Sequence, residues 1–600
     1  MTMAHQGEGI QQKQEGVQDR RPSPVLPGDL PPTPKPLRLW PGVVLAALVS
    51  ALIVGMPWLT DSLFVRFMAM FMGPMALALL VVLWWVFASR AAWGDKLLFP
   101  AVFLLAGAAG FLLSAESFRM GVLMYGLWAA AAAWPAWLLV SPGFSMPARR
   151  LGFAVLIAAV FGFCTLLRMD GVDGNFSAEI AWRFSATAED RYLAELAKRE
   201  KAEVAGAAVG KSGDWTGFRG EKRDGIARGV RIGNTDWKER QPRLVWSQRV
   251  GPGWSSFAVV GDRLYTQEQQ DKAEAVVCYQ ASTGKTVWTH KDEERFYEPV
   301  AGTGPRATPT FHAGRLYALT AKGTLSCLDA ATGKRHWKAD LREDTGAKLP
   351  EWGFASSPCV AHGLVTVYGG AKDKAVAAYD LKTGKLAWAK GSGGHGYSSV
   401  QPAMLAGKEV LLAASGPGLI GLDPKTGDTV LDYEWPMQEG MARCTQSPVV
   451  DGTDLLFGAG FGLGTRRVRF KEKDGKLAGS EVWETKAASP YFNDMVLHKG
   501  HAYGFDGEFL TCFSLEDGEK AWKVRGYGNG QVLLLPGQDL LVVVGEKSGE
   551  AALVEATPEK HVSRGKFKWT KAKTWNHPVV ADGKLYLRNG EDMACYDVGR

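Results

Sequence analysis

The amino-acid sequence predicts an all-α bundle of five transmembrane helices followed by an all-β, eight-bladed propeller. Two observations lead to this prediction. A short phrase, cleanest at residues 378–388 (AYDLKTGKLAW), recurs along the C-terminal part of the chain, and five long apolar runs lie between Leu39 and Leu167. Each copy of the phrase combines a strand, a tight glycine turn and a second strand with a tryptophan. Such hairpins, repeated at intervals of about 40–50 residues, are typical of propellers.

The repeat count comes from two sets of signals. Further copies of the phrase begin at Cys278, Cys327, Gly421 and Cys512. Upstream strand pairs of the form S/T-P-x-V-x-x-G-x-L-Y, such as those at residues 308–317 and 577–586, bring the number of blades to eight. The outer tryptophan positions are then expected at residues 246, 288, 337, 388, 431 (a leucine), 483, 522 and 569.

The two ends of the repeat region are expected to meet. The chain stops after residues 595–598 (CYDV), where a glycine turn and a tryptophan strand should follow. An unpaired strand, residues 243–246 (RLVW), stands at the start of the region. Completing the last blade with this first strand closes the ring and leaves no open sheet edge.

The phrase A-x-D-x-x-T-G-K-x-x-W resembles the tryptophan-docking motif of the pyrroloquinoline-quinone (PQQ) repeat family, over roughly residues 215–600. That family includes eight-bladed quinoprotein alcohol dehydrogenases and a non-enzymatic outer-membrane assembly lipoprotein. The resemblance implies that each motif tryptophan packs over small residues and docks one blade on the next. The matching residues are Trp288, Trp337, Trp388 and Trp522, with Cys278, Cys327, Ala378, Gly421, Cys512 and Cys595 as the small partners.

The cysteine pattern departs from that of the dehydrogenases in this family. Four of the seven cysteines occupy the same strand position in different blades, so they are too far apart to form disulfides. The dehydrogenases typically carry two adjacent cysteines against the cofactor. This sequence contains no Cys-Cys pair and no C-x-x-C-H haem motif, which favours a non-catalytic protein.

The apolar runs cover residues 39–59, 67–89, 97–115, 120–140 and 151–167, and none contains Asp, Glu, Lys or Arg. Their lengths suit a hydrocarbon core about 30 Å thick. Cytoplasmic loops carry an excess of Lys and Arg. Eight such residues flank one side of the runs (20, 21, 35, 38, 90, 96, 149 and 150) and four the other (66, 119, 168 and 183). We therefore expect a multi-pass inner-membrane protein with a cytoplasmic N-terminus and a periplasmic propeller.

Composition sets the remaining boundaries. Residues 1–38 are rich in Pro and Gln, which predicts a disordered cytoplasmic tail without a cleavable signal peptide. Residues 39–167 form the transmembrane region, residues 168–212 a helical periplasmic stalk and residues 213–600 the propeller. Within the stalk, residues 177–208 combine charges of both signs with one apolar face, which predicts a helix. This helix either packs on the propeller or the membrane surface, pairs with another copy, or serves as a solvated spacer, and the last interpretation is favoured.

Segments entering the innermost strands are expected to converge on one end of the central channel. Their aromatic, amide and charged side chains would suit an anionic, planar or sugar-like ligand. Alternatively, these groups only satisfy turns and fill the channel. Asn493 and Asp494 are the only adjacent amide–carboxylate pair there, and PQQ binding with Ca²⁺ needs such oxygen ligands. The candidate residues are Trp254, Arg306, Tyr491, Asn493, Asp494, Asn576 and His577.

Two functions remain open at this stage. The first is a membrane-anchored, non-catalytic scaffold or binding module for an envelope protein or a small polar ligand. The second is a quinoprotein dehydrogenase that uses PQQ with Ca²⁺ and passes electrons to membrane quinone. The lipid bilayer is a partner in both. Lys and Arg (69) nearly balance Asp and Glu (62), and no basic stripe is present, so nucleic acid is not expected as a partner.

Overall fold

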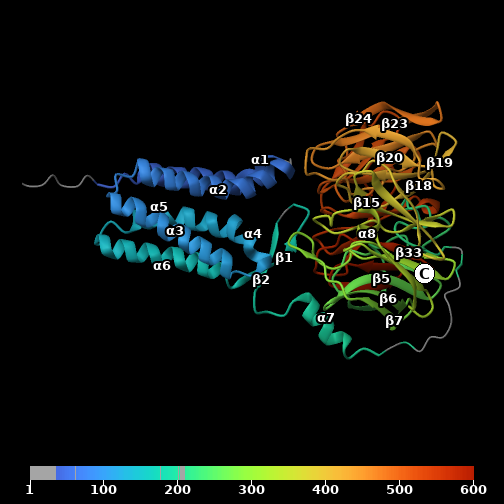
Figure 1. The fold of residues 1–600 in the computed structure, drawn as a ribbon, viewed down its shortest axis with the longest axis horizontal. Coiled ribbons are helices and arrows are strands. Elements are labelled where there is room, and N and C mark those ends of the chain that lie inside the picture. The colour runs from blue at the N-terminus through green and yellow to red at the C-terminus, as the bar shows by residue number, and fades with distance from the viewer. Residues whose placement is uncertain are drawn as a thin grey trace, which may run out of the picture.

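The computed structural model describes residues 36–60, 63–175, 177–200, 202, 210–211 and 213–599. Figure 1 shows two parts along the long axis, a bundle of helices and a ring of sheets, with a small hairpin and a short helix between them. Nearly all of the expected N-terminal tail, residues 1–38, lies outside the described residues.

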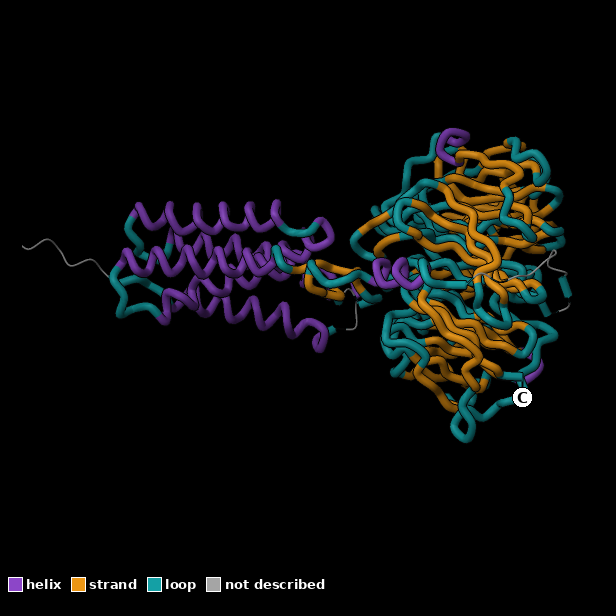
Figure 2. Tube along the Cα trace, turned by 90° about the horizontal axis from the view of Figure 1, so that it is seen from below, coloured by secondary structure: helices purple, strands orange, loops and turns teal. Residues whose placement is uncertain are grey.

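Helical segments run side by side along the bundle (Figure 2), and the structure divides them into five. They are α1 Trp40–Leu59, α2 Leu63–Phe87, α3 Trp93–Leu113, a composite segment of η1 Glu116–Phe118, α4 Arg119–Gly121, the π-helical turn η2 Val122–Gly126 and α5 Leu127–Val140, and finally α6 Met146–Cys164. Among the described residues, four segments are long and apolar enough to cross a membrane; the apolar stretch of α1, Trp40–Met56, is shorter. Five helices are present, and four of them reach spanning length by this measure.

Aromatic side chains fill the centre of the bundle. The ring centroid of Phe99 in α3 lies 4.7 Å from Trp85 in α2 and 4.4 Å from Phe153 in α6. Trp134 in α5 lies within 6.0 Å of the same three rings. Because lipid tails are as apolar as these side chains, van der Waals packing of this kind holds membrane helices together.

The strands of the C-terminal part form antiparallel blades. The strands, blade by blade, are β4 Ala258–Val260, β5 Arg263–Gln270, β6 Ala273–Gln280 and β7 Thr286–Asp292; β10 Thr310–His312, β11 Arg315–Leu319, β12 Thr324–Asp329 and β13 Arg335–Asp340; β14 Cys359–Ala361, β15 Leu364–Ala371, β16 Lys374–Asp380 and β17 Leu386–Lys390; β18 Gln401–Leu405, β19 Lys408–Ala414, β20 Gly418–Leu422 and β21 Thr429–Glu434; β22 Asp454–Ala459, β23 Gly464–Lys473 and β24 Lys476–Thr485; β25 Val496–His498, β26 His501–Asp506, β27 Phe509–Ser514 and β28 Lys520–Val524; β29 Gln531–Leu535, β30 Leu540–Val544, β31 Glu550–Glu555 and β32 Ser563–Lys568; and β33 Val579–Ala581, β34 Lys584–Arg588, β35 Asp592–Asp597 and β3 Arg243–Arg249.

Short elements lie between some of these blades. They are β8 Tyr297–Glu298, which pairs with β9 Gly302–Thr303, and the helix α8 Leu341–Thr345. The 3-10 turn η3 Pro536–Gln538 instead connects β29 with β30 inside a blade. The strands β18–β24 form one seven-stranded sheet, because a parallel contact of Leu431 with Leu477 joins two neighbouring blades. The expected number of eight blades is obtained when this sheet is counted as two.

The ring closes in the predicted way. Strand β3 pairs antiparallel with β35, with Leu244 opposite Tyr596 and Trp246 opposite Cys595. The first strand of the propeller therefore completes its last blade. This pairing satisfies backbone groups that would otherwise form an exposed sheet edge.

The recurring tryptophans join one blade to the next. Trp337 lies opposite Cys327 within its own blade, as the resemblance implied. Its indole covers the Thr-Gly turn of the following blade, where a Cβ on Gly384 would lie 2.5 Å from the ring. The indole N–H also donates to the Leu381 carbonyl at 3.1 Å. The turn glycine is thus required both by its positive φ of 70° and by the space that the tryptophan occupies.

One expected docking position is wrong. Trp569 was expected to be the docking tryptophan of the blade β29–β32. In the register of the other blades, the docking tryptophan corresponds instead to the residue opposite Leu553, and that residue is Gly565. A Cβ on Gly565 would lie 2.9 Å from the Cβ of Trp237, whose ring packs against Phe567 with centroids 5.4 Å apart. The segment that precedes β3 therefore supplies a tryptophan at a site where the repeat itself has none.

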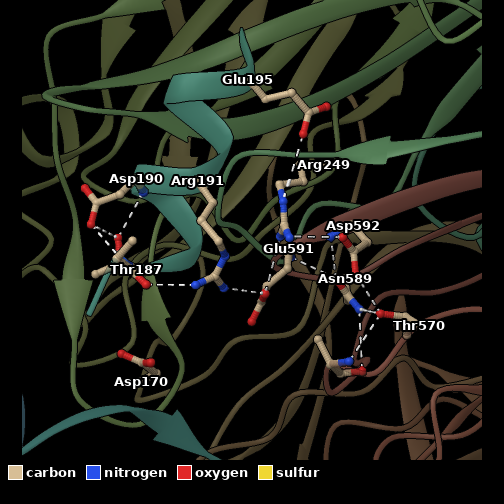
Figure 3. Close-up of polar contacts among 12 residues, drawn as sticks. Asp170, Thr187, Asp190, Arg191, Glu195, Arg249, Thr570, Asn589, Glu591 and Asp592 are labelled. Atoms are coloured by element: carbon tan, nitrogen blue, oxygen red, sulfur yellow. Dashed lines mark hydrogen bonds and ion pairs between the residues drawn. The ribbon is translucent and has the colours of Figure 1, made fainter. Parts of the chain in front are cut away.

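The predicted helical stalk is also only partly helical. Strands β1 Leu167–Val172 and β2 Ala178–Trp182 form a hairpin directly after α6, and the helix α7 covers only Ala188–Leu196. Thr187 and Asp190 form the capping box at the start of α7 (Figure 3). The alternation of apolar and polar residues before Thr187 suits a strand better than a helix. Residues 201 and 203–208 of the expected helix lie outside the described residues.

Helix α7 packs on the propeller and is not a solvated spacer. Tyr192 is completely buried, and its hydroxyl donates to the carboxylate of Glu268 in β5. Arg191 pairs with Glu591 at 3.2 Å, and Figure 3 shows the two side chains facing each other. Because the Tyr192 side chain is buried against polar partners on the propeller, α7 is docked on the propeller at this residue.

Candidate functional site

A loop from the protein itself runs along the inside of the ring. This plug, residues 215–226, pairs with inner strands at both ends, through Trp215 with Val259 and through Ile226 with Leu534. Between these ends, Arg223 donates to the carbonyls of Ser357 and Pro358 at 2.8 Å each.

The plug also contacts the opposite part of the ring. Arg219 donates to the Met495 carbonyl at 2.8 Å and pairs with Asp494 at 3.3 Å. The guanidinium groups of Arg219 and Arg223 therefore satisfy carbonyl groups at the entrances of two blades that are not neighbours, β14–β17 and β25–β28. The plug holds these blades together through the channel.

The turn of the β1–β2 hairpin covers the channel at the end next to the helix bundle. In this cap, residues 172–175, the Gly174 amide donates to Glu546 at 2.5 Å. Asp173 pairs with Lys547 at 2.7 Å, and the Val172 carbonyl accepts from Lys573 at 2.6 Å. The chain thus contacts the channel mouth immediately after it leaves the bundle (Figure 1).

A cavity of about 190 Å³ lies between the plug and the cap, since both contribute to its lining. Aromatic side chains contribute much of its apolar wall. Trp254 and Trp575 lie with ring centroids 4.6 Å apart, and Trp352 and Tyr397 are stacked at 5.0 Å. Further aromatic lining comes from Phe218, Tyr491 and Phe492.

The structure brings most of the candidate residues to this cavity. Asn493 and Asn576 instead donate to backbone carbonyls, those of Gly530 at 2.6 Å and Ser255 at 2.7 Å. These two amides connect neighbouring blades. The candidates that line the cavity are Trp254, Arg306, Tyr491, Asp494 and His577.

Arg306 is fully engaged by the protein. Its guanidinium pairs with Glu298 at 3.1 Å and donates to the carbonyls of Gly302 at 2.7 Å, Gly304 at 2.9 Å and Trp352 at 3.2 Å. Burial lowers the pKa of Arg306, and the negative charge of Glu298 opposes this shift. The Arg306 guanidinium, a candidate for binding an anionic ligand, is therefore already occupied by the chain.

The acidic candidate Asp494 also has internal partners. Its carboxylate lies 3.3 Å from Arg219 and 3.1 Å from His577. Burial alone would raise the pKa of Asp494, but the positive charge of Arg219 and the contact with His577 bring that pKa below its usual value. Burial lowers the pKa of His577, which favours the neutral imidazole. The Arg219–Asp494 pair leaves little net charge beside the cavity.

These residues do not fit PQQ with Ca²⁺. PQQ carries three carboxylates, whereas Arg219 and Arg306 are already paired with Asp494 and Glu298. Asp494, an expected calcium ligand, is neutralised by a guanidinium. Across the described residues, no group of three or more His, Cys, Asp or Glu side chains is arranged to hold a metal ion. Cys444 lines the cavity as a free thiol.

Several residues of the site were not anticipated from the sequence. Glu546 is buried beneath the cap and accepts from the Trp575 indole at 2.5 Å and from Gly174. Burial raises the pKa of Glu546, and these hydrogen bonds oppose the shift. Phe218 meets His577 edge-on at 5.1 Å. Glu546 and Phe218 lie in segments without a repeat signature, so only their proximity in space reveals them.

The repeat architecture and this channel define a class of protein. Residues 293–524 match the family model described as outer membrane protein assembly factor BamB. The C-terminal part of the chain is thus similar to this PQQ-like repeat family, as its recurring motif implied.

Two curated relatives illustrate the range of the family. The chain is 23% identical over 287 residues to the outer membrane protein assembly factor BamB of Bordetella pertussis, which covers 47% of this chain and 68% of the relative. It is 31% identical over 158 residues to the 1-butanol dehydrogenase (quinone) of Thauera butanivorans, which covers 23% of this chain and 24% of that enzyme. The chain thus spans about a quarter of the length of this dehydrogenase.

Solved structures of both kinds resemble the chain. BamB from Moraxella catarrhalis has a TM-score of 0.43 at 16% identity and covers 59% of this chain and 97% of its own. The quinohemoprotein alcohol dehydrogenase ADHIIG from Pseudomonas putida HK5 has a TM-score of 0.49 at 14% identity and covers 65% of this chain and 81% of its own.

Proposed function

We propose that the protein is a membrane-anchored, non-catalytic PQQ-like propeller that serves as a scaffold or binding module on the envelope side of the inner membrane. The observation that carries this proposal is the pairing of Asp494 with Arg219 at 3.3 Å. A guanidinium neutralises the carboxylate on which a PQQ-bound calcium ion would depend. The cap and the plug further reduce the access of a large cofactor to the channel.

The partner in this proposal is an envelope protein or a small polar ligand. The BamB relative is by name an assembly factor for outer membrane proteins, which supports a protein partner. The charges at the channel mouth are largely paired internally, so a partner is expected to contact the outer surfaces of the blades.

The second candidate function is a PQQ-dependent quinoprotein dehydrogenase that passes electrons to membrane quinone. The 31% identity with the quinone-dependent 1-butanol dehydrogenase favours it, as does the aromatic wall of the cavity. Planar ligands stack readily on such walls. This alternative requires Arg219 to leave Asp494 when cofactor and metal bind.

Reconstitution of the protein with PQQ and Ca²⁺ distinguishes between the two functions. The full chain, purified in detergent, is incubated with PQQ and Ca²⁺, and its absorbance and dye reduction with alcohols and sugars are measured. We expect no bound PQQ after desalting and no substrate-dependent reduction. Substrate-dependent reduction that is lost in Asp494→Asn would establish the dehydrogenase instead. That variant removes the charge but keeps a side chain of similar size.

The orientation in the membrane is part of the proposal. Helix α1 has 20 residues, and at 1.5 Å per residue it is about 30 Å long, enough to cross the hydrocarbon core. Five crossings place the two ends of the chain on opposite sides. Alkaline phosphatase fused after Arg600 should be active, and the same reporter fused after Arg90 should be inactive. Activity only at Arg90 would reverse the orientation.

A further inference from the structure

The β1–β2 hairpin has one apolar and one polar face. In its register, Leu167 is opposite Trp182 and Met169 is opposite Ile180. Residues directly opposite each other in an antiparallel pair share a face, and successive residues alternate between faces. These four apolar side chains therefore lie together, whereas Arg168, Asp170 and Glu179 belong to the other face.

The apolar face continues the surface of the helix bundle. Met169 is buried in the bundle core, while Ile180 is 46% exposed and Trp182 is 57% exposed. The ring of Trp182 meets Phe163 of α6 edge-on at 5.9 Å, and Phe163 is itself about half exposed. Phe184, just after the hairpin, is 82% exposed. The apolar surface of α6 thus continues directly onto the hairpin.

A basic residue fixes the hairpin to the ends of two helices. The Arg183 guanidinium donates to the Leu113 carbonyl at 2.9 Å and to the Thr165 carbonyl at 3.4 Å. Leu113 is the last residue of α3, and Thr165 caps α6. The hairpin is therefore held at the level where these helices end. Tryptophan is enriched at this level in membrane proteins, because its ring is apolar and its N–H is polar.

The polar face of the hairpin is directed toward the propeller. Arg168, Asp170 and Glu179 contribute to a cavity of about 620 Å³, which also borders propeller residues such as Arg295 and Lys573. Lys573 pairs with Glu179 at 3.2 Å and also donates to the cap. The polar face of the hairpin thus lies toward the propeller and water, whereas its apolar face extends the surface of the helix bundle.

We propose that the β1–β2 hairpin is an interfacial membrane element whose Ile180, Trp182 and Phe184 side chains contact lipid at the boundary of the bilayer that faces the propeller. The occupant is lipid because the exposed face is continuous with that of a membrane-spanning helix and contains no charged side chain. The same hairpin carries the cap, so lipid contact on one face holds the channel mouth closed against the bilayer surface. This inference does not depend on the proposed function.

Site-specific fluorescence in lipid tests the proposal. The full chain, carrying Ile180→Cys and an environment-sensitive nitrobenzoxadiazole label, is placed in nanodiscs of phosphatidylethanolamine and phosphatidylglycerol. Nitroxide is attached near the headgroups of a fraction of the lipids. The matched control is Glu179→Cys, adjacent on the same strand but on the polar face. The seven native cysteines are buried or partly buried, and the unsubstituted chain treated in parallel gives their background.

Nitroxide lipids should quench the label at residue 180 by about twofold or more relative to residue 179, as for side chains at headgroup level. Equal quenching at the two positions would overturn the proposal. Iodide, a quencher dissolved in the water, reports exposure of the label to solvent. A label at residue 180 that neither iodide nor nitroxide lipid quenches would also overturn the proposal, because a protein surface or a second copy would then cover the face. Binding of PQQ would contradict the proposed function and leave this result unchanged.

Discussion

Replacing Gly384 by alanine tests whether tryptophan docking joins the blades. Gly384 has a φ of 70°, and a Cβ at this position would lie 2.5 Å from the indole of Trp337. Gly407 provides a matched control, because its φ is 78° and a Cβ there meets nothing within 4 Å. Both substitutions place alanine in the left-handed region. Only Gly384→Ala adds a collision between two blades.

The expected magnitudes follow from these two contributions. Left-handed backbone costs an L-residue about 1–2 kcal/mol, which applies to both variants. Overpacking of a buried contact adds about 1–3 kcal/mol at Gly384, because Trp337 is held between blades and can move only with its strand. Gly384→Ala should therefore lower the free energy of unfolding by about 2–5 kcal/mol and Gly407→Ala by about 1–2 kcal/mol.

Equilibrium unfolding of the full chain in detergent, followed by tryptophan fluorescence in guanidinium chloride, measures the difference. The midpoint should fall further in Gly384→Ala than in Gly407→Ala, with the same slope in both. Equal shifts would refute the docking argument, since they would show that the backbone conformation alone determines the cost.

Three further predictions follow from the fold and the site. Deleting β3, residues 243–249, should unpair β35 and lower the unfolding midpoint far more than deleting seven residues of an exposed loop; equal midpoints would contradict ring closure. Arg306→Ala should lower the free energy of unfolding by about 3–5 kcal/mol, because it leaves Glu298 buried without its partner; unchanged stability would show that the rim is not structural. Burial raises the pKa of Glu274 to about 8, above the usual value of about 4.3, so the folded chain binds an extra proton and loses stability as the pH rises through 8. Glu274→Gln should therefore be more stable than the parent chain at pH 9 but not at pH 5 in denaturant titrations, and an equal difference at both pH values would contradict this linkage.

The sequence predicts those parts of the fold that depend on local patterns. The clean copies of the phrase each contain a turn glycine and a tryptophan, so the family resemblance implies the docking of Trp337 on the next copy, where the structure places Gly384. The pairing of β3 with β35 follows from counting strands at the two ends. The apolar helices follow from length and composition in the same way.

The missed features depend on contacts between distant segments. Trp237 replaces a docking tryptophan that the repeat lacks, and the sequence gives no sign that it meets Gly565. Arg306 is a candidate for binding a ligand because the sequence places it just before an inner strand, whereas Glu298 is recognisable as its partner only once the chain has folded. The β1–β2 hairpin was missed for a local reason. Its alternation of apolar and polar residues is present in the sequence, but it is too short to distinguish a strand from a helix.

The pairing of the first and last strands also bears on how the protein is made. Arg243 and Asp597, which form a hydrogen bond in the closed ring, are separated by 354 positions. At about 5–20 residues per second, synthesis of the intervening chain takes roughly 20–70 s. During that time β3 exists without its partner, anchored by helices made before it. Only a chain translated as far as β35 can complete the ring, so a product truncated before β35 keeps an open sheet edge that folding factors and proteases are able to recognise.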